Sequence, residues 1–243
     1  MMDSQPLWSV SDFESGRRRA AASHAGLQRQ TLLSSTLQAE LRTLERRRES
    51  ADALEVFAAC LRLRESALID LRCGEFVWPV TVFPEQMLYH SPRSLLRADR
   101  RELAALRVLE IEPAGVRPPG HWMHERVADA AAYHALKPVL WRLALEGPRA
   151  ELLHEVTGPT VYRVVGHPAR QDLPTPGALG PAIDRLRKES APLRQIARWP
   201  GMSYERASRL VNALYLTSNL IVSRAHPGAQ PGLLQALLSR LAR

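Results

Sequence analysis

Hydrophobic positions follow helix spacing near the start of the chain and strand spacing directly after it. Between Leu27 and Arg64, leucines recur at intervals of three and four residues, which predicts two helices that each bury one face. Residues 67–73 and 76–83 are rich in β-branched, apolar and aromatic residues and are separated by Gly74-Glu75. This pattern predicts a β-hairpin, in which Pro79 favours an edge position or a bulge for the second strand.

The same two spacings alternate through the middle of the chain. Further short strands are predicted at 87–90, 106–112 and 160–165. Further helices are predicted at 94–106 and within 127–155. The order of the elements predicts an α+β fold that is mostly helical, with a small mixed or antiparallel sheet in an N-terminal domain.

Proline and glycine divide the chain. Four prolines and three glycines fall between residues 166 and 181, so we place a linker at 167–180. Residues 28–166 then form an α+β regulatory or interaction domain that begins with helices, and 181–243 form a second domain. Residues 1–27 are polar and lack periodicity, which predicts a disordered tail. Its aromatic residues Trp8 and Phe13 are either incidental or part of a docking peptide.

The second domain has the most specific pattern. Residues 181–224 predict three short helices followed by a strand at Leu220-Ile221-Val222. Ser203 is a favourable N-cap for the third helix after the turn at Gly201. Within that helix, an apolar stripe recurs at the spacing i, i+3, i+4, i+7: Ala207, Leu210, Val211 and Leu214. This stretch resembles the winged helix-turn-helix superfamily, so a C-terminal winged helix is expected.

The resemblance implies that the third helix enters the major groove of double-stranded DNA. Arg206 and Arg209 would then reach base edges or phosphates, with Ser208 and Asn212 beside them. Six further cations would contact phosphates: Arg185, Arg187, Lys188, Arg194, Arg198 and Arg224. Two features depart from the pattern, because Glu205 stands near the start of the helix and no second wing strand is evident after Arg224.

The C-terminal tail predicts an amphipathic helix whose apolar stripe consists of Leu233, Leu234, Leu237, Leu238 and Leu241. Packing against either domain is the favoured role of this stripe, and a dimer or partner interface is the alternative. The N-terminal helices could also mediate dimerisation, although their stripe is too short for a coiled coil.

The charge distribution supports a polyanion partner for the second domain. The net charge is +8, and residues 180–243 contain ten Lys and Arg against three acids, whereas the first 179 residues are nearly balanced. An excess confined to one module is typical of nucleic-acid binding. All but two of the basic residues are arginines, a bias that can also reflect genome composition.

Candidate catalytic chemistry is sparse. The sequence contains no phosphate-binding glycine loop and no GxSxG nucleophile motif. His121 and His124 with Glu125 lack the spacing of zinc-protease helices and follow a proline-rich loop, so we expect neither a metal site nor a cofactor. Cys60 and Cys73 do not make a disulfide framework and are expected to be buried.

The sequence therefore predicts a non-enzymatic regulator that binds DNA through the winged helix under control of the N-terminal domain. The alternative is a signalling adaptor whose winged helix and C-terminal helix bind protein, and a third, weaker class is a metal-dependent enzyme using His121 and His124. The chain has no apolar signal core and no run long enough to span a membrane, which favours a cytoplasmic setting.

Overall fold

The computed structural model describes residues 7–23, 33–168 and 173–224. The chain forms two compact units, Met1–Ala150 and Glu151–Arg243. The division falls earlier than the linker predicted at 167–180, because the strand β7 (Thr160–Val164) pairs with β8 (Leu220–Arg224) and so belongs to the second unit. The predicted tail helix with Leu233, Leu234, Leu237, Leu238 and Leu241 lies outside the described residues.

The first unit is built on an antiparallel sheet with the strand order β5-β2-β3-β4-β6, and β1 pairs with β3 beside this path. The strands are β1 (Trp8–Ser9), β2 (Ala67–Cys73), β3 (Phe76–Phe83), β4 (Leu88–His90), β5 (Arg107–Pro113) and β6 (Tyr133–Ala135). The predicted α+β class and the hairpin at Gly74-Glu75 are confirmed. All of the described strand pairs in this sheet are antiparallel.

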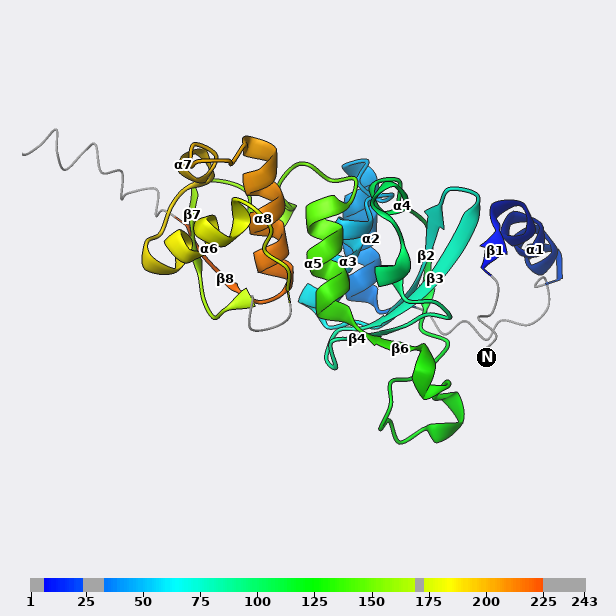
Figure 1. The fold of residues 1–243 in the computed structure, drawn as a ribbon. Coiled ribbons are helices and arrows are strands. Elements are labelled where there is room, and N and C mark those ends of the chain that lie inside the picture. Colours follow the sequence, from blue (N-terminus) through cyan, green and yellow to red (C-terminus); the bar gives the residue numbers. More distant parts are fainter. Residues whose placement is uncertain (1–6, 24–32, 169–172, 225–243) are drawn as a thin grey trace, which may run out of the picture. The chain divides into compact units, whose positions relative to one another are not determined.

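Helices cover one face of this sheet. α2 (Ser35–Arg46), α3 (Ala53–Leu63) and α5 (Leu136–Glu146) lie together on that side (Figure 1). Successive side chains of a strand point to opposite faces, so Ile69 and Leu71 of β2 share the helix-facing side with their partners Val80 and Trp78 of β3. All four are at most 1% exposed, and they form the core of the unit with the apolar sides of the helices.

Pro79 does not mark an edge strand. β3 pairs with β2 along its length, and on its other side with β1 at Phe76-Val77 and with β4 at 81–83. Pro79 lies between these two short ladders, where pairing on that side is interrupted. A residue without a backbone N–H is tolerated at such a position.

The predicted disordered tail is wrong for its central part. Residues 8–9 form β1, and α1 spans Val10–Ser23 (Figure 1). Phe13 is only 8% exposed, and Arg17 forms an ion pair with Glu110 of β5. Strand pairing, one buried aromatic ring and one ion pair therefore dock this arm, which the polar composition of the segment did not reveal.

The predicted long helices are interrupted where new caps begin. Residues 94–106 divide into the 3-10 helix η1 (Leu95–Arg97) and α4 (Arg100–Ala104), because Asp99 forms a capping box with Glu102.

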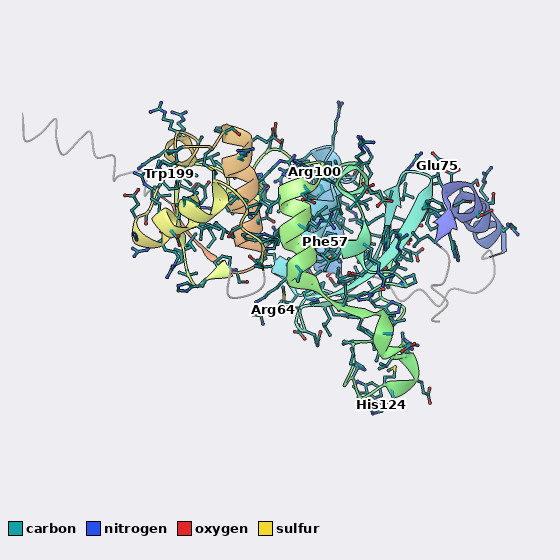
Figure 2. All side chains as sticks on the ribbon, viewed as in Figure 1. Phe57, Arg64, Glu75, Arg100, His124 and Trp199 are labelled. Carbon is teal, nitrogen blue, oxygen red and sulfur yellow. The ribbon has the colours of Figure 1, made fainter. Side chains whose placement is uncertain are left out.

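Residues 114–132 form an excursion that contains the 3-10 helices η2 (His124–Arg126) and η3 (Ala130–Ala132), and β6 follows it. His124 lies toward its far end (Figure 2).

Arg149 anchors the end of the first unit. Its guanidinium contacts Asp52 at 2.7 Å, Glu55 at 2.8 Å and Glu49 at 3.5 Å. The Arg149 side chain is 10% exposed and that of Glu55 only 2%, so the network is largely shielded from water. Asp52 also caps α3 through the backbone N–H of Leu54, which joins the network to the start of that helix.

The second unit contains three helices followed by a strand, in the predicted order. After the 3-10 helix η4 (His154–Val156) and β7 come α6 (Leu179–Lys188), α7 (Leu193–Ile196), α8 (Tyr204–Leu216) and β8. Tyr162 of β7 exchanges two backbone hydrogen bonds with Ala191, between α6 and α7. β7 thus lies between this bridge and β8. In the described parts of both units, no helix is long and apolar enough to cross a membrane.

Candidate nucleic-acid interface

The turn between α7 and α8 is fixed by two residues. Gly201 has φ +73°, and a Cβ at this position would lie 2.8 Å from Cβ of Ala178, so both the backbone conformation and the space require glycine. Ser203 caps α8, as predicted, by accepting a hydrogen bond of 3.1 Å from the backbone N–H of Arg206. The start of α8 therefore projects from a defined turn.

One side of α8 agrees with its sequence pattern. The predicted stripe of Ala207, Leu210, Val211 and Leu214 is fully buried. The expectation of an exposed face at Ser208 and Asn212 is wrong, because both side chains are 0% exposed. Neither side chain is therefore open to DNA on the surface of this unit.

Asn212 ties the segment that leads into η4 to α8. Its Oδ1 accepts a hydrogen bond of 2.9 Å from the backbone N–H of Leu153, and its Nδ2 donates one of 2.8 Å to the backbone carbonyl of Glu151. Ser208 instead donates its hydroxyl proton back to the carbonyl of Tyr204 in the preceding turn, at 3.0 Å. The polarity of both residues thus satisfies internal hydrogen bonds.

The two predicted base-reading arginines differ in their availability. Arg209 donates to the carboxylate of Glu205 at 2.8 Å and its side chain is only 16% exposed. Arg206 is exposed, and its Nη1 donates to the carbonyl of Gly201 at 2.7 Å, which neutralises none of its charge. Glu205 therefore opposes Arg209 directly, whereas the charge of Arg206 stays available to an anion.

The predicted phosphate contacts divide in the same way. Arg185 pairs with Glu189 at 2.5 Å and lies 4.7 Å over the ring of Trp199, and Arg187 approaches Asp184 at 3.7 Å. Trp199 itself lies beside the helices of this unit (Figure 2).

The remaining four cations are exposed: Lys188, Arg194, Arg198 and Arg224. Arg224 donates to the carbonyl of Glu155 at 3.3 Å. The side chains of Arg194 and Arg198 have no hydrogen-bond or ion-pair partner within the described ranges.

These cations give the described part of the second unit an excess of positive charge. It contains nine Lys and Arg against five carboxylates, of which Asp184, Glu189 and Glu205 are taken up in the ion pairs above. Arg194 and Arg198 on and after α7 and Arg206 on α8 flank the same turn, and none of the three pairs with a carboxylate of the described chain. We call these three residues the basic turn.

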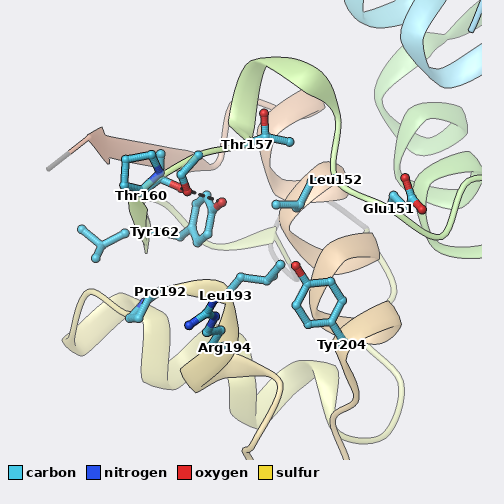
Figure 3. Close-up of a pocket in the computed structure, with 12 residues that line it drawn as sticks. Glu151, Leu152, Thr157, Thr160, Tyr162, Pro192, Leu193, Arg194 and Tyr204 are labelled. Atoms are coloured by element: carbon cyan, nitrogen blue, oxygen red, sulfur yellow. Dashed lines mark hydrogen bonds between the residues drawn. The ribbon is translucent and has the colours of Figure 1, made fainter. Parts of the chain in front are cut away.

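A groove beside the basic turn escaped the sequence prediction. Its volume is about 840 Å³, and its walls come from residues 151–162 and from the starts of α7 and α8. Tyr162, Leu193 and Tyr204 line the same hollow from three segments, with Arg194 beside Leu193 (Figure 3). Tyr204 is 60% exposed. The signal that could have pointed to it is the strand predicted at 160–165, because no second wing strand was evident after Arg224 and β7 pairs with β8.

The residues of the weaker metal hypothesis belong to the first unit. His121 Nδ1 accepts a hydrogen bond from the backbone N–H of Met123, and His124 begins η2. Over the described ranges, no group of three or more His, Cys, Asp and Glu is arranged to hold a metal ion. Cys60 and Cys73 are buried free thiols, and burial raises the pKa of Cys60 to about 12 and that of Cys73 to about 11.

The comparisons with known proteins found no match to the chain. No protein-family model matches the chain, and neither a curated protein nor a solved structure matches it significantly.

Proposed function

We propose that the chain is a DNA-binding regulator whose second unit is a winged-helix module. The observation that carries this proposal is the basic turn, because Arg194, Arg198 and Arg206, none with a described carboxylate partner, lie on either side of the turn that leads into α8. In helix-turn-helix proteins, the N-terminal residues of the second helix of the motif approach the bases, and the flanking elements contact phosphates. The proposed interface therefore centres on the turn and the first turn of α8, and excludes Ser208 and Asn212.

The strand pairing supports the module in a modified form. In this proposal β8 is the first wing strand, and β7, which precedes the three helices, takes the place of the second. The bridge between Tyr162 and Ala191 adds a third segment to this small sheet, between the first two helices. The wing is then complete without a strand after Arg224, which removes one of the two departures seen in the sequence.

Control by the first unit is the second part of the proposal. Its sheet and helices make a separate core, which suits a domain that receives a signal or a partner.

A titration of the full chain against a labelled DNA duplex at moderate salt tests the DNA-binding part. Binding that weakens as salt is added supports the proposal, and no binding at any salt concentration rejects it.

The alternative function is a signalling adaptor, and the groove favours it. Apolar side chains from several segments line the groove, including Leu152, Val161 and Leu193. Peptides and helices of partner proteins commonly bind in such hollows. If the chain is an adaptor, affinity purification recovers a defined protein partner, and Val161→Glu in the groove abolishes the capture while Arg206→Ala leaves it unchanged.

A further inference from the structure

The outer face of the sheet in the first unit carries a buried carboxylate without a hydrogen-bond partner in the described structure. Asp70 lies in the middle of β2, paired with Glu110 of β5 on one side and with Pro79 of β3 on the other. It is 5% exposed, and its carboxylate accepts no hydrogen bond from the described residues. Aspartate is disfavoured in strands, and a largely buried carboxylate without a hydrogen bond is costly, so packing alone does not explain it.

Two more carboxylates share this face. Glu110 is the cross-strand neighbour of Asp70, and Glu112 lies two residues further along β5, so the pleat places all three side chains on one side. We call Asp70, Glu110 and Glu112 the carboxylate cluster. One oxygen of Glu110, Oε2, is buried and without a hydrogen-bond partner in the described structure.

Arg17 of α1 is the cation in contact with the cluster, and Arg72 and its partner Arg107 lie further along the same face of β2 and β5. Arg17 of α1 donates to Oε1 of Glu110 at 2.5 Å, and its side chain is half exposed at 53%. Arg18 and Arg19 of the same triplet also donate to carbonyls of their own helix, at Glu14 and Ser15. Among the described ion pairs, the cluster has one, between Arg17 and Glu110. The charge imbalance agrees with the direction of titration, because burial first and then Glu112 and Glu110 raise the pKa of Asp70 to about 7, against the lowering effect of Arg17.

We infer that the carboxylate cluster is a binding site for arginine side chains of a protein partner, and that Arg17 of the docked arm occupies it in the absence of that partner. A guanidinium offers five donors in a planar fork that suits adjacent carboxylates. The arm is a weak occupant, since it is held by a two-residue strand pairing, by Phe13 and by this ion pair. An arginine-rich segment that brings more than one guanidinium satisfies the cluster better and displaces the arm.

The site is independent of the proposed DNA interface, because every residue in it belongs to the first unit. It gives the proposed regulatory unit a class of partner, namely a basic peptide segment. A variant that loses peptide binding can therefore still be measured for DNA binding, and a variant that loses DNA binding can still be measured for peptide binding.

The test uses the full chain and a labelled peptide with the sequence of residues 7–23, followed by fluorescence anisotropy. Arg17→Ala in the full chain removes the internal competitor, and we expect the peptide to bind this variant at least tenfold more tightly than the wild-type chain. Adding Asp70→Asn and Glu110→Gln to Arg17→Ala should weaken binding at least tenfold. Glu85→Gln, at an exposed carboxylate of the same unit, is the matched control and should have no effect.

Two results overturn the inference. Equal affinity of the wild-type and Arg17→Ala chains shows that the arm does not occupy the site. Binding that survives the removal of the cluster shows that the peptide binds elsewhere. Circular dichroism verifies the fold of each variant, and Glu112→Gln, at an exposed position of the cluster, provides a milder change that should still weaken binding severalfold.

Discussion

The side chain of Asn212 binds the backbone of Leu153, which lies 59 residues earlier in the sequence. The N–H of Leu153 donates a hydrogen bond of 2.9 Å to Oδ1 of Asn212. This bond, with the second one to Glu151, closes the segment before β7 over α8. It explains why a polar residue at a helical position that the pattern assigns to solvent is buried. It also shows that the second unit begins before β7 and not at the proline-rich stretch.

Asn212→Ala should therefore destabilise the second unit. The substitution removes two hydrogen bonds that tie residues 151–153 to α8, one of them from the buried N–H of Leu153, which costs about 2–4 kcal/mol. Ser208→Ala is the matched comparison, because it removes only a local bond within the helix and should cost less than about 1 kcal/mol. Urea unfolding of both variants measures the difference. Equal stability of the two variants would contradict the bridging role of Asn212.

Arg149→Ala should unfold the first unit more readily, because it removes the guanidinium that Glu55, Asp52 and Glu49 share in a site shielded from water. Removing one partner from such a network costs about 3–5 kcal/mol. Arg62→Ala at the partly exposed pair with Glu40 should cost about 1 kcal/mol or less. Thermal denaturation of the two variants distinguishes the cases, and a small effect at Arg149 would mean that the network contributes little.

Asp70 should make the stability of the first unit fall as the pH rises. Its pKa is raised from 3.8 to about 7 in the folded chain, so the folded state retains a proton that the unfolded state has released between these values. The free energy of unfolding therefore decreases with rising pH across this window. Since one pKa unit is worth about 1.4 kcal/mol, Asp70→Asn should stabilise the unit by on the order of 2–4 kcal/mol at pH 8.

Near pH 4 the same variant should differ little from the wild type, because Asp70 is then protonated in the folded chain. Melting curves of Asp70→Asn and of the control Glu85→Gln at both pH values provide the measurement. A stabilisation of the same size at pH 4 and pH 8 would show that titration of Asp70 is not its cause.

Glu205→Gln should tighten DNA binding. The substitution removes a negative charge near the phosphates and releases Arg209 from its ion pair, so we expect a gain of about three- to tenfold. Removing an acid from the first turn of α8 should cost about 0.3–1 kcal/mol of stability. Anisotropy titrations with a duplex at fixed salt measure the gain, and weaker binding would place Glu205 itself in a contact with DNA.

Local sequence patterns predicted the positions of helices and strands better than they predicted which distant segments pair or pack together. The spacing of Leu210 and Leu214 and the cap at Ser203 were visible in the sequence, because each depends on residues within a few positions along one helix. The pairing of β7 with β8 was not, since the strands are separated by about sixty residues and proline suggested a boundary between them. The burial of Asn212 and the docking of Phe13 were missed for the same reason, because each depends on a distant segment.

The candidate site was predictable only in its general charge. The sequence located the basic excess in the last quarter of the chain, but it could not separate Arg209, which Glu205 neutralises, from Arg206, which no described carboxylate neutralises. The carboxylate cluster was also hidden, because Asp70 and Glu110 are forty residues apart and meet only through strand register.

The salt dependence of DNA binding tests the central proposal most directly. Removing one cation that contacts a phosphate should make the slope of log affinity against log salt shallower by about 0.9. Replacing Arg194, Arg198 and Arg206 by alanine in the full chain should therefore reduce the slope by about 2–3 and weaken binding at moderate salt. A control that removes the same charge replaces the exposed arginines Arg42, Arg47 and Arg100 of the first unit and should leave the slope unchanged. Equal slopes for both triple variants would contradict DNA binding at the basic turn.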